Sequence, residues 1–189
     1  MHAEDRLADI RVEVGERLDR ERRRHASRVL KLGAKCVVDT SGPALKMALA
    51  EGVTLIKPNL VELSDLVGVP LDTDNARIAA CRRLAIEGRA EVVAVTLGDQ
   101  GALLVTADKA FRSQPLAIEP VSTVGAGDSF LGGLVAALAS GHSLHEAFRV
   151  AVAAGSAAVL SPGTELCSEE NVQRLLREVK LNDVTLAPA

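Results

Sequence analysis

Short apolar runs alternate with longer runs of helical period along most of this 189-residue chain. The runs with strand character cover residues 35–39, 54–57, 92–97, 102–106 and, more weakly, 116–118. The runs with helical period cover residues 4–32, 42–51, 60–67, 74–87, 127–140, 143–160 and 168–180. Because strands and helices alternate up to residue 97, the pattern predicts βαβ units and a mostly parallel sheet. The sequence therefore predicts the α/β class.

A glycine-rich turn opens directly into one of these helices. Gly125 and Gly127 flank a single small residue, Asp128 follows, and an apolar helical run begins at Phe130. Free backbone N–H groups and the positive end of the helix dipole suit an anion such as a phosphate. A carboxylate beside a phosphate is repulsive unless it has a task such as taking a proton from an attacking hydroxyl. The turn predicts phosphoryl transfer, and the alternative is a plain helix start with an acidic residue.

Two better-known nucleotide motifs are absent from the sequence. No Gly-x4-Gly-Lys-Ser/Thr occurs, which excludes a P-loop enzyme. The dinucleotide fingerprint also fails, because Phe130 stands where its third glycine belongs. An anion at this turn is therefore predicted to be bound by neither a P-loop nor a dinucleotide-binding motif.

Four motifs in order resemble those of the ribokinase/PfkB family of carbohydrate kinases. They are VSTVGAGDSFLGGLVAALASG (121–141), KPNLVE (57–62), VTLGDQGA (95–102) and AVAAGSAA (151–158), which leads into SPGT (161–164). The resemblance covers residues 30–176, and within the family it is strongest to the phosphofructokinase branch. It implies a ribokinase-like three-layer α/β/α fold with a mostly parallel sheet.

The resemblance also implies a catalytic site. Asp128 is expected to be the base that accepts the proton of the sugar hydroxyl as this oxygen attacks the γ-phosphate of ATP. Gly125, Ala126 and Gly127 are expected to donate backbone N–H groups to the charge that develops on the transferred phosphoryl group. The alternative for Asp128 is an N-terminal capping acid.

Asn59 and Glu62 are the predicted ligands of a magnesium ion. They lie one helical turn apart after Pro58, so both side chains can face one pocket. Amide and carboxylate oxygens suit Mg²⁺, which keeps several of its waters. In the family this pair serves Mg²⁺ and the nucleotide phosphates, and Asp39 matches a family acid in the same region. The alternatives are a helix cap for Asn59 and a surface acid for Glu62.

The resemblance assigns further residues to the nucleotide. Those expected on the ATP side are Thr96, Gly98, Gly101, Ala154, Gly155 and Ser156. The alternatives are plain residues of a hairpin-like turn for Gly98 and Gly101, and ordinary helix packing for the small residues 154–156. A monovalent-cation loop that binds K⁺ in relatives matches Ser122, Val124, Ala158, Ser161, Gly163 and Glu165, of which Glu165 departs from the pattern.

The rest of the chain divides into a charged start and a short tail. Residues 1–29 match the family poorly and carry apolar residues at spacings of 3, 4 and 4, which predicts one amphipathic helix. Residues 30–181 form the ribokinase-like nucleotide-binding and catalytic portion, and residues 182–189 are predicted to be a frayed tail. The first strands of the family's sheet and its lid over the substrate have no counterpart here, so we expect a truncated product or a fragment.

Composition excludes several other classes of function. Aromatic residues make up 2% of the chain and the net charge is −3, which disfavours nucleic-acid binding. No run of 18 apolar residues is present, so no membrane span is expected. Three widely spaced cysteines are typical of reduced thiols in the cytoplasm. Missing strands leave an apolar sheet edge, which predicts a homo-oligomer.

Three hypotheses follow for the function. The first is an ATP-dependent kinase of a sugar or sugar phosphate, most similar to a phosphofructokinase that converts fructose 6-phosphate to fructose 1,6-bisphosphate. The second is a truncated remnant that binds Mg-ATP without a complete sugar site. The third is a regulatory or scaffolding module that reuses the fold. Binding of ATP separates the third hypothesis from the first two, and turnover that depends on sugar separates the first from the second.

Overall fold

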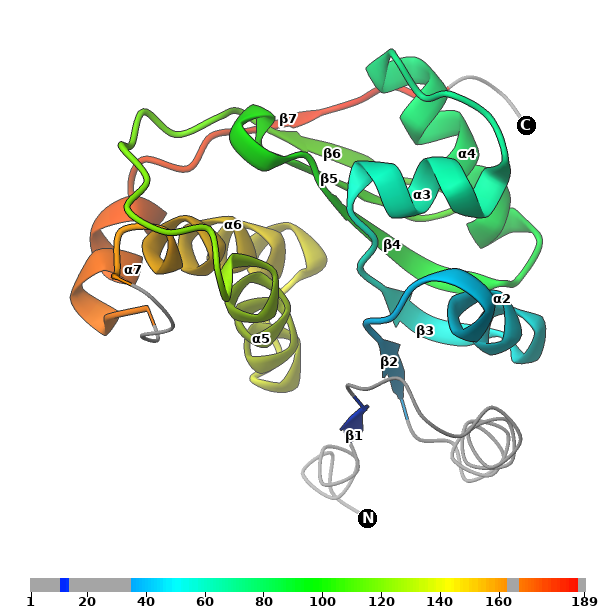
Figure 1. The fold of residues 1–189 in the computed structure, drawn as a ribbon, viewed down its shortest axis with the longest axis horizontal. Coiled ribbons are helices and arrows are strands. Elements are labelled where there is room, and N and C mark those ends of the chain that lie inside the picture. Colours follow the sequence, from blue (N-terminus) through cyan, green and yellow to red (C-terminus); the bar gives the residue numbers. More distant parts are fainter. Residues whose placement is uncertain (1–10, 14–34, 163–166, 187–189) are drawn as a thin grey trace. The chain divides into compact units, whose positions relative to one another are not determined.

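The computed structural model describes residues 11–13, 35–162 and 167–186 (Figure 1). These residues fall into two compact units. The first unit contains residues up to Thr96 together with Leu103–Ala110 and Thr185–Ala189, and the second contains Leu97–Ala102 and Phe111–Val184. Each unit is described by itself below.

The first unit is built on a sheet whose strands lie in chain order, and the first four of them pair in parallel. They are β1 (Arg11–Glu13), β2 (Cys36–Val38), β3 (Val53–Ile56) and β4 (Ala90–Thr96), followed by β5 (Ala102–Val105). The registers pair Val38 with Ile56 and Ile56 with Val93, all in the parallel sense. Helices connect β2 to β3 and β3 to β4, as βαβ units require, whereas the short Gly98–Gly101 turn leads from β4 to β5. The predicted parallel sheet is therefore confirmed for this unit.

Among the residues of this unit that the structure describes, three helices accompany the sheet, and each begins where the sequence provides a start signal. They are α2 (Gly42–Glu51), α3 (Leu60–Val67) and α4 (Asp74–Ile86). Pro43 stands in the first turn of α2, Asn59 caps α3, and the Thr73 hydroxyl caps α4 by accepting the N–H of Ala76 at 3.2 Å. The last helix ends one residue before the predicted boundary at residue 87. Local capping chemistry thus reproduces the predicted helices closely.

The core of the first unit consists of aliphatic side chains from both kinds of element. All four residues of β5 are buried, which is typical of a strand covered on both faces. The fully or nearly fully buried side chains on the other elements are Leu45, Leu49, Leu55, Ile56, Leu63, Val93 and Val95. Cys81 is also buried, and burial raises the pKa of its thiol to about 12. That thiol is therefore protonated and unreactive at neutral pH.

The second unit is mostly helical. It contains α5 (Ala126–Ala139), α6 (Leu144–Ala158) and α7 (Glu169–Leu176), with α6 packed against both of the others. It also contains the antiparallel pair β6 (Ala110–Ser113) and β7 (Leu181–Asp183), of which Ala110 belongs to the first unit. Phe130 and Phe148 meet edge to face between α5 and α6 with ring centroids 6.2 Å apart. This aromatic contact anchors the start of α5 on the middle of α6.

Several predicted elements are wrong. Arg11–Glu13 form a strand beside Cys36–Val38, where a helix over 4–32 was predicted, and the rest of that predicted helix lies outside the described residues. Residues 116–118 are not a strand, and the strand of this region is Ala110–Ser113. The predicted frayed tail begins with β7, because residues 181–183 pair with β6. Arg11–Glu13 and Leu181–Asp183 pair with strands that are distant in the sequence, so the local pattern alone did not predict them.

Candidate functional site

The predicted site residues are divided between the two units. Asp39, Asn59, Glu62 and Thr96 lie in the first unit. The second unit holds Gly98, Gly101, Ser122, Gly125, Ala126, Gly127, Asp128, Ala154, Gly155 and Ser156. Each group is therefore a cluster with its own geometry.

The first cluster lies at the carboxyl edge of three parallel strands. Asp39 follows β2 and Asn59 follows β3, while Thr96 is the last residue of β4. The N–H of Thr96 donates to the carbonyl of Pro58 at 3.2 Å, and Asn59 and Thr96 form a parallel bridge. The carboxyl ends of parallel strands are the usual place for ligand sites in α/β proteins. The structure thus brings these predicted residues to one edge.

Asn59 and Glu62 form a capping box at the start of α3. The Asn59 side chain accepts the N–H of Glu62 at 2.9 Å, and Glu62 Oε2 accepts the N–H of Asn59 at 2.8 Å. This arrangement satisfies two free donors of the helix and accounts for both residues without a metal. It also fixes both side chains in place, with the second carboxylate oxygen of Glu62 left for a further contact.

Asp39 pairs with Lys57, a residue that sequence reasoning did not assign to the site. Lys57 Nζ lies 3.1 Å from Asp39 Oδ2, and the two side chains are 8% and 19% exposed. Burial of one charge alone is costly, so each charge requires the other. In the described ranges no three His, Cys, Asp or Glu side chains are grouped to hold a metal directly. The donor set of this edge fits Mg²⁺ held mainly through water.

The second cluster centres on the first turn of α5. Gly125 is the N-cap with φ of 80°, a left-handed conformation that glycine adopts at little cost, and no side chain caps the helix there. The helix begins at Ala126, one residue earlier than predicted. The Ala126 N–H reaches the Thr123 carbonyl only at 3.5 Å. The first turn thus keeps N–H groups available, as a helix start without a cap does.

Asp128 is the third residue of α5 and its side chain is exposed. Within the part of the chain that the structure describes, its carboxylate has no hydrogen-bond or ion-pair partner. The interpretation of Asp128 as a capping acid therefore has no supporting contact. The role of Asp128 as a base next to a phosphate stays a prediction.

Ala154 and Gly155 are where α6 passes closest to α5. A Cβ added at Gly155 meets Phe130 Cβ at 3.0 Å and the Ala126 carbonyl oxygen at 3.1 Å. Ala154 is buried, and its Cβ lies 2.9 Å from a Cβ added at Gly133. Helix packing accounts for these small residues, and a nucleotide contact at Ser156, which is half-buried, stays a prediction. The packing has a further effect, since it holds the first turn of α5 in place.

Ser122 connects the preceding loop to the end of α6. Its N–H and that of Val121 both donate to the Val159 carbonyl, at 3.2 and 2.7 Å. Its hydroxyl accepts the N–H of Val124 at 3.3 Å. These bonds fix the loop before the glycine turn. Of the predicted cation loop, Gly163 and Glu165 lie outside the described residues, so that loop stays a prediction.

The Gly98–Gly101 turn contains a short 3₁₀ helix, Gly98–Gln100. Gly98 and Gly101 have φ values of 62° and 92°, which residues other than glycine rarely adopt. The Leu97 N–H closes the turn on the Gly101 carbonyl at 2.9 Å. Both glycines are therefore required by the backbone, whether or not a nucleotide lies beside them.

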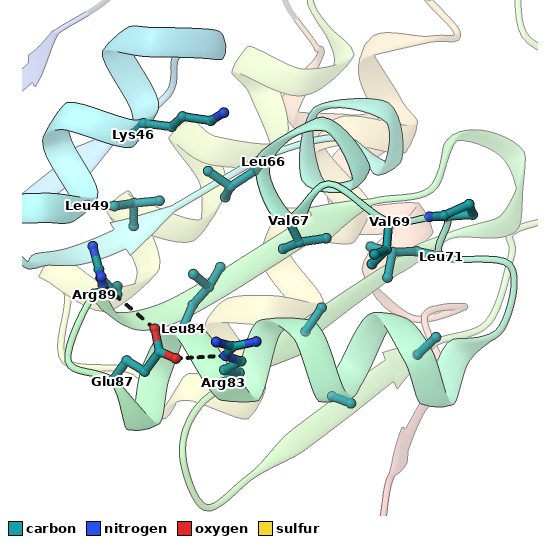
Figure 2. Close-up of a pocket in the computed structure, with 14 residues that line it drawn as sticks. Lys46, Leu49, Leu66, Val67, Val69, Leu71, Arg83, Leu84, Glu87 and Arg89 are labelled. Atoms are coloured by element: carbon teal, nitrogen blue, oxygen red, sulfur yellow. Dashed lines mark hydrogen bonds and ion pairs between the residues drawn. The ribbon is translucent and has the colours of Figure 1, made fainter.

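A groove of about 690 Å³ lies between α2, α3 and α4 of the first unit, as Figure 2 shows. Its wall includes Leu49, Leu66 and Leu84, and none of the predicted site residues lines it. Glu87 joins Arg83 at 2.7 Å and Arg89 at 3.7 Å along its rim. The hydrogen bond from Arg83 lowers the pKa of Glu87 and raises that of Arg83. The groove is thus separate from both clusters.

The chain belongs to the pfkB family of carbohydrate kinases, whose family model matches residues 20–171. It is 44% identical to ATP-dependent 6-phosphofructokinase isozyme 2 of Escherichia coli K12 over 146 residues, which are 77% of this chain and 47% of the relative. It is 34% identical to 1-phosphofructokinase of Borreliella burgdorferi over 79% of this chain and 48% of the relative. The chain spans about half the length of these curated relatives.

A solved structure of phosphofructokinase-2 from Escherichia coli, in complex with substrates and products, has the same fold. The TM-score is 0.82 at 39% identity, over 88% of this chain and 54% of that one. The ribokinase-like α/β fold predicted from the sequence is therefore confirmed. In the ranges that the structure describes, no helix has the length and apolar character needed to cross a bilayer.

Proposed function

We propose that this chain takes part in the ATP-dependent phosphorylation of a sugar phosphate, most similar to that of a phosphofructokinase. The observation that supports this best is the uncapped first turn of α5, where Asp128 is exposed beside free backbone N–H groups. Membership of the pfkB family and similarity to an ATP-dependent 6-phosphofructokinase agree with it. Fructose 6-phosphate is the proposed acceptor, with fructose 1,6-bisphosphate as the product.

Asp128 is the proposed general base. Its carboxylate takes the proton of the sugar hydroxyl while that oxygen forms a bond to the γ-phosphorus of ATP, and the bond from that phosphorus to the β-γ bridging oxygen breaks to release ADP. Such a base typically contributes 10²–10⁴-fold to the rate. Gly125, Ala126 and Gly127 donate N–H groups to the oxygens of the transferred phosphoryl group, and each donor contributes about 2.7–4 kcal/mol to lowering the barrier.

The edge of the first unit is the proposed place of Mg²⁺ and part of the nucleotide. When bound, Mg²⁺ neutralises charge on the phosphates. Glu62 would hold the hydrated ion through the carboxylate oxygen that the capping box leaves available, and Asn59 holds Glu62 in position. Asp39 acts at longer range, because Lys57 already binds its carboxylate. Thr96 contacts the nucleotide from the end of β4.

The second unit supplies the other proposed nucleotide contacts. Gly98 and Gly101 shape the turn that faces ATP. Ser156 contributes a polar contact to ATP from α6. Ala154 and Gly155 act by letting α6 pass close to the start of α5. The loop at Ser122 is the proposed site of a K⁺ ion, held through backbone carbonyls.

Calorimetric titration with Mg-ATP tests this proposal. The 189-residue chain is compared with Asp128→Asn, Gly127→Val and the matched control Asp72→Asn, which changes an exposed acid outside both clusters. We expect Asp128→Asn and Asp72→Asn to bind Mg-ATP as the unchanged chain does. We expect Gly127→Val to lose binding, because its side chain occupies the place of the phosphate.

Turnover is measured next as ADP release with and without fructose 6-phosphate. ADP release that requires the sugar and is lost in Asp128→Asn supports the kinase. Binding of Mg-ATP without such turnover identifies the remnant that binds nucleotide alone. No binding at millimolar Mg-ATP contradicts the proposal.

A further inference from the structure

Arg112 on β6 holds the Gly98–Gly101 turn through backbone carbonyls. Its Nη1 donates to the carbonyl of Gln100 at 2.8 Å and to that of Ala102 at 3.4 Å. The same nitrogen donates to the carbonyl of Ser113. A guanidinium is always charged, and its Nη1 carries two N–H groups that these three carbonyls share, with the contact to Ala102 the longest. The two turn carbonyls that it binds flank Gly101.

Ser113 contacts the same turn from the interior. It is fully buried, and its Oγ accepts the N–H of Ala102 at 2.8 Å. A Cβ added at Gly101 meets both the carbonyl oxygen and the Oγ of Ser113 at 2.8 Å, and the Arg112 Nη1 at 3.1 Å. Gly101 is thus pressed against β6 and cannot be replaced without moving backbone. The turn is fixed on one side by these two residues.

Local backbone bonds also close the turn. They run from Leu97 to Gly101 at 2.9 Å, and from Gln100 to Leu97 and Gly101 to Gly98 at 3.2 Å each. A turn of this size with two left-handed glycines has few contacts that define a single conformation. Charge-assisted bonds from Arg112 are stronger than these neutral ones. Arg112 therefore adds charge-assisted bonds to the carbonyls on either side of Gly101.

We infer that Arg112 and Ser113 are positioning residues that hold the Gly98–Gly101 turn in the shape that receives the nucleotide. The inference rests on the proposed function, in which this turn faces ATP. Neither residue touches a reacting group. They restrict the conformation of the turn before Mg-ATP binds, so less conformational entropy is lost on binding. Such preorganisation raises the affinity for Mg-ATP.

The test compares Arg112→Met with Arg112→Lys and with the control Arg177→Met, which removes an exposed arginine that contacts no part of this turn. Calorimetry gives the Kd for Mg-ATP, and NMR gives the hydrogen-exchange rates of the amides of residues 100–102. We expect Arg112→Met to weaken Mg-ATP binding about tenfold, through loss of charged hydrogen bonds, and to speed exchange in the turn. Arg112→Lys recovers part of both effects, and Arg177→Met changes neither.

The melting temperature separates positioning from a general loss of stability. We expect Arg112→Met to melt close to the unchanged chain while exchange rises only in the turn. The inference is overturned if Arg112→Met binds Mg-ATP normally while Gly127→Val does not, or if exchange in the turn is unchanged. If the unchanged chain fails to bind Mg-ATP, the proposed function and the nucleotide role of the turn both fail, and the exchange rates alone show whether Arg112 orders the turn.

Discussion

Helices α5 and α6 pack against each other and carry an acid at the same position, yet their first turns differ. Both Asp128 and Glu146 are the third residue of their helix. Glu146 accepts the hydroxyl of Ser143 at 2.8 Å and its N–H at 3.1 Å, which completes a capping box. Gly125 provides no side-chain cap, and Asp128 is exposed. The comparison teaches that a capping box accounts for Glu146, whereas no capping contact accounts for Asp128.

The largest expected difference between the two helices is in turnover. Asp128→Asn should lower sugar-dependent ADP release by about 10²–10⁴-fold, the usual contribution of a general base. Glu146→Gln removes an acid from the same helical position and should leave turnover unchanged, because Glu146 serves only its own cap. A coupled assay for ADP measures both. Equal losses in the two variants would mean that the acids act through helix stability.

The contact between α5 and α6 gives the next largest effect. Gly155→Ala should destabilise the chain by about 1–3 kcal/mol, because its Cβ meets Phe130 and the Ala126 carbonyl at 3.0 and 3.1 Å. Gly132→Ala, on the same helix as Phe130, meets nothing within 4 Å. It should stabilise the chain by about 0.5–1 kcal/mol through helix propensity. Urea unfolding measures both, and destabilisation of similar size in the two would contradict close packing at Gly155.

The side-chain cap of α6 should contribute a smaller amount to the free energy of unfolding. Ser143→Ala removes the side chain that accepts the Glu146 N–H and should cost about 1 kcal/mol. Ser41→Ala is the matched control, since Ser41 is the N-cap of α2 but makes no side-chain capping bond. Urea unfolding of both variants gives the difference. Equal effects would show that the capping bond of α6 adds nothing to stability.

The smallest expected effect is on the pH dependence of stability. The hydrogen bond from the Ser143 hydroxyl, followed by that from its backbone N–H, lowers the pKa of Glu146 in the folded chain. The stabilisation is therefore present above the unfolded carboxyl pKa of about 4.3 and is lost as pH falls through the lower folded value. Glu146→Gln should remove this part of the acid sensitivity. Urea unfolding at neutral and acidic pH measures this pH dependence. If the free energy of unfolding of Glu146→Gln depends on pH as that of the unchanged chain does, the hydrogen bonds from Ser143 to Glu146 do not contribute.

Much of the fold could be predicted because its signals are local. The helices α3, α4 and α6 begin at Asn59, Thr73 and Ser143, whose side chains cap them. The strands β2, β3 and β4 are short apolar runs between such helices, a pattern that specifies parallel pairing. Each of these signals lies within a few residues of the element that it defines.

The short strands could not be predicted for the same reason. Ala110–Ser113 pairs antiparallel with Leu181–Asp183, about 70 residues later in the sequence. Arg11–Glu13 is a strand because it pairs with Cys36–Val38, whereas its helical spacing favoured a helix. Three or four residues are too few to show a hydrophobic period, so pairing with another strand determines whether they form a strand.

The candidate site divides in a similar way. The glycine turn and its acid could be identified from the sequence, because residues 125–128 are contiguous. The pairing of Lys57 with Asp39 and the contacts of Arg112 with the Gly98–Gly101 turn could not, because they join side chains across separate elements. Lys57 stood within a recognised motif, whereas nothing in the sequence singled out Arg112 or Ser113.

The central claim is that the first turn of α5 binds the phosphates and that of α6 does not. The most direct test is an NMR titration of the ¹⁵N-labelled 19.8 kDa chain with Mg-ATP, which follows both turns in one sample. We predict that the amide signals of residues 125–128 shift in a saturable way while those of residues 144–146 stay in place. Shifts of equal size at both helix starts, or none at residues 125–128, would contradict the account.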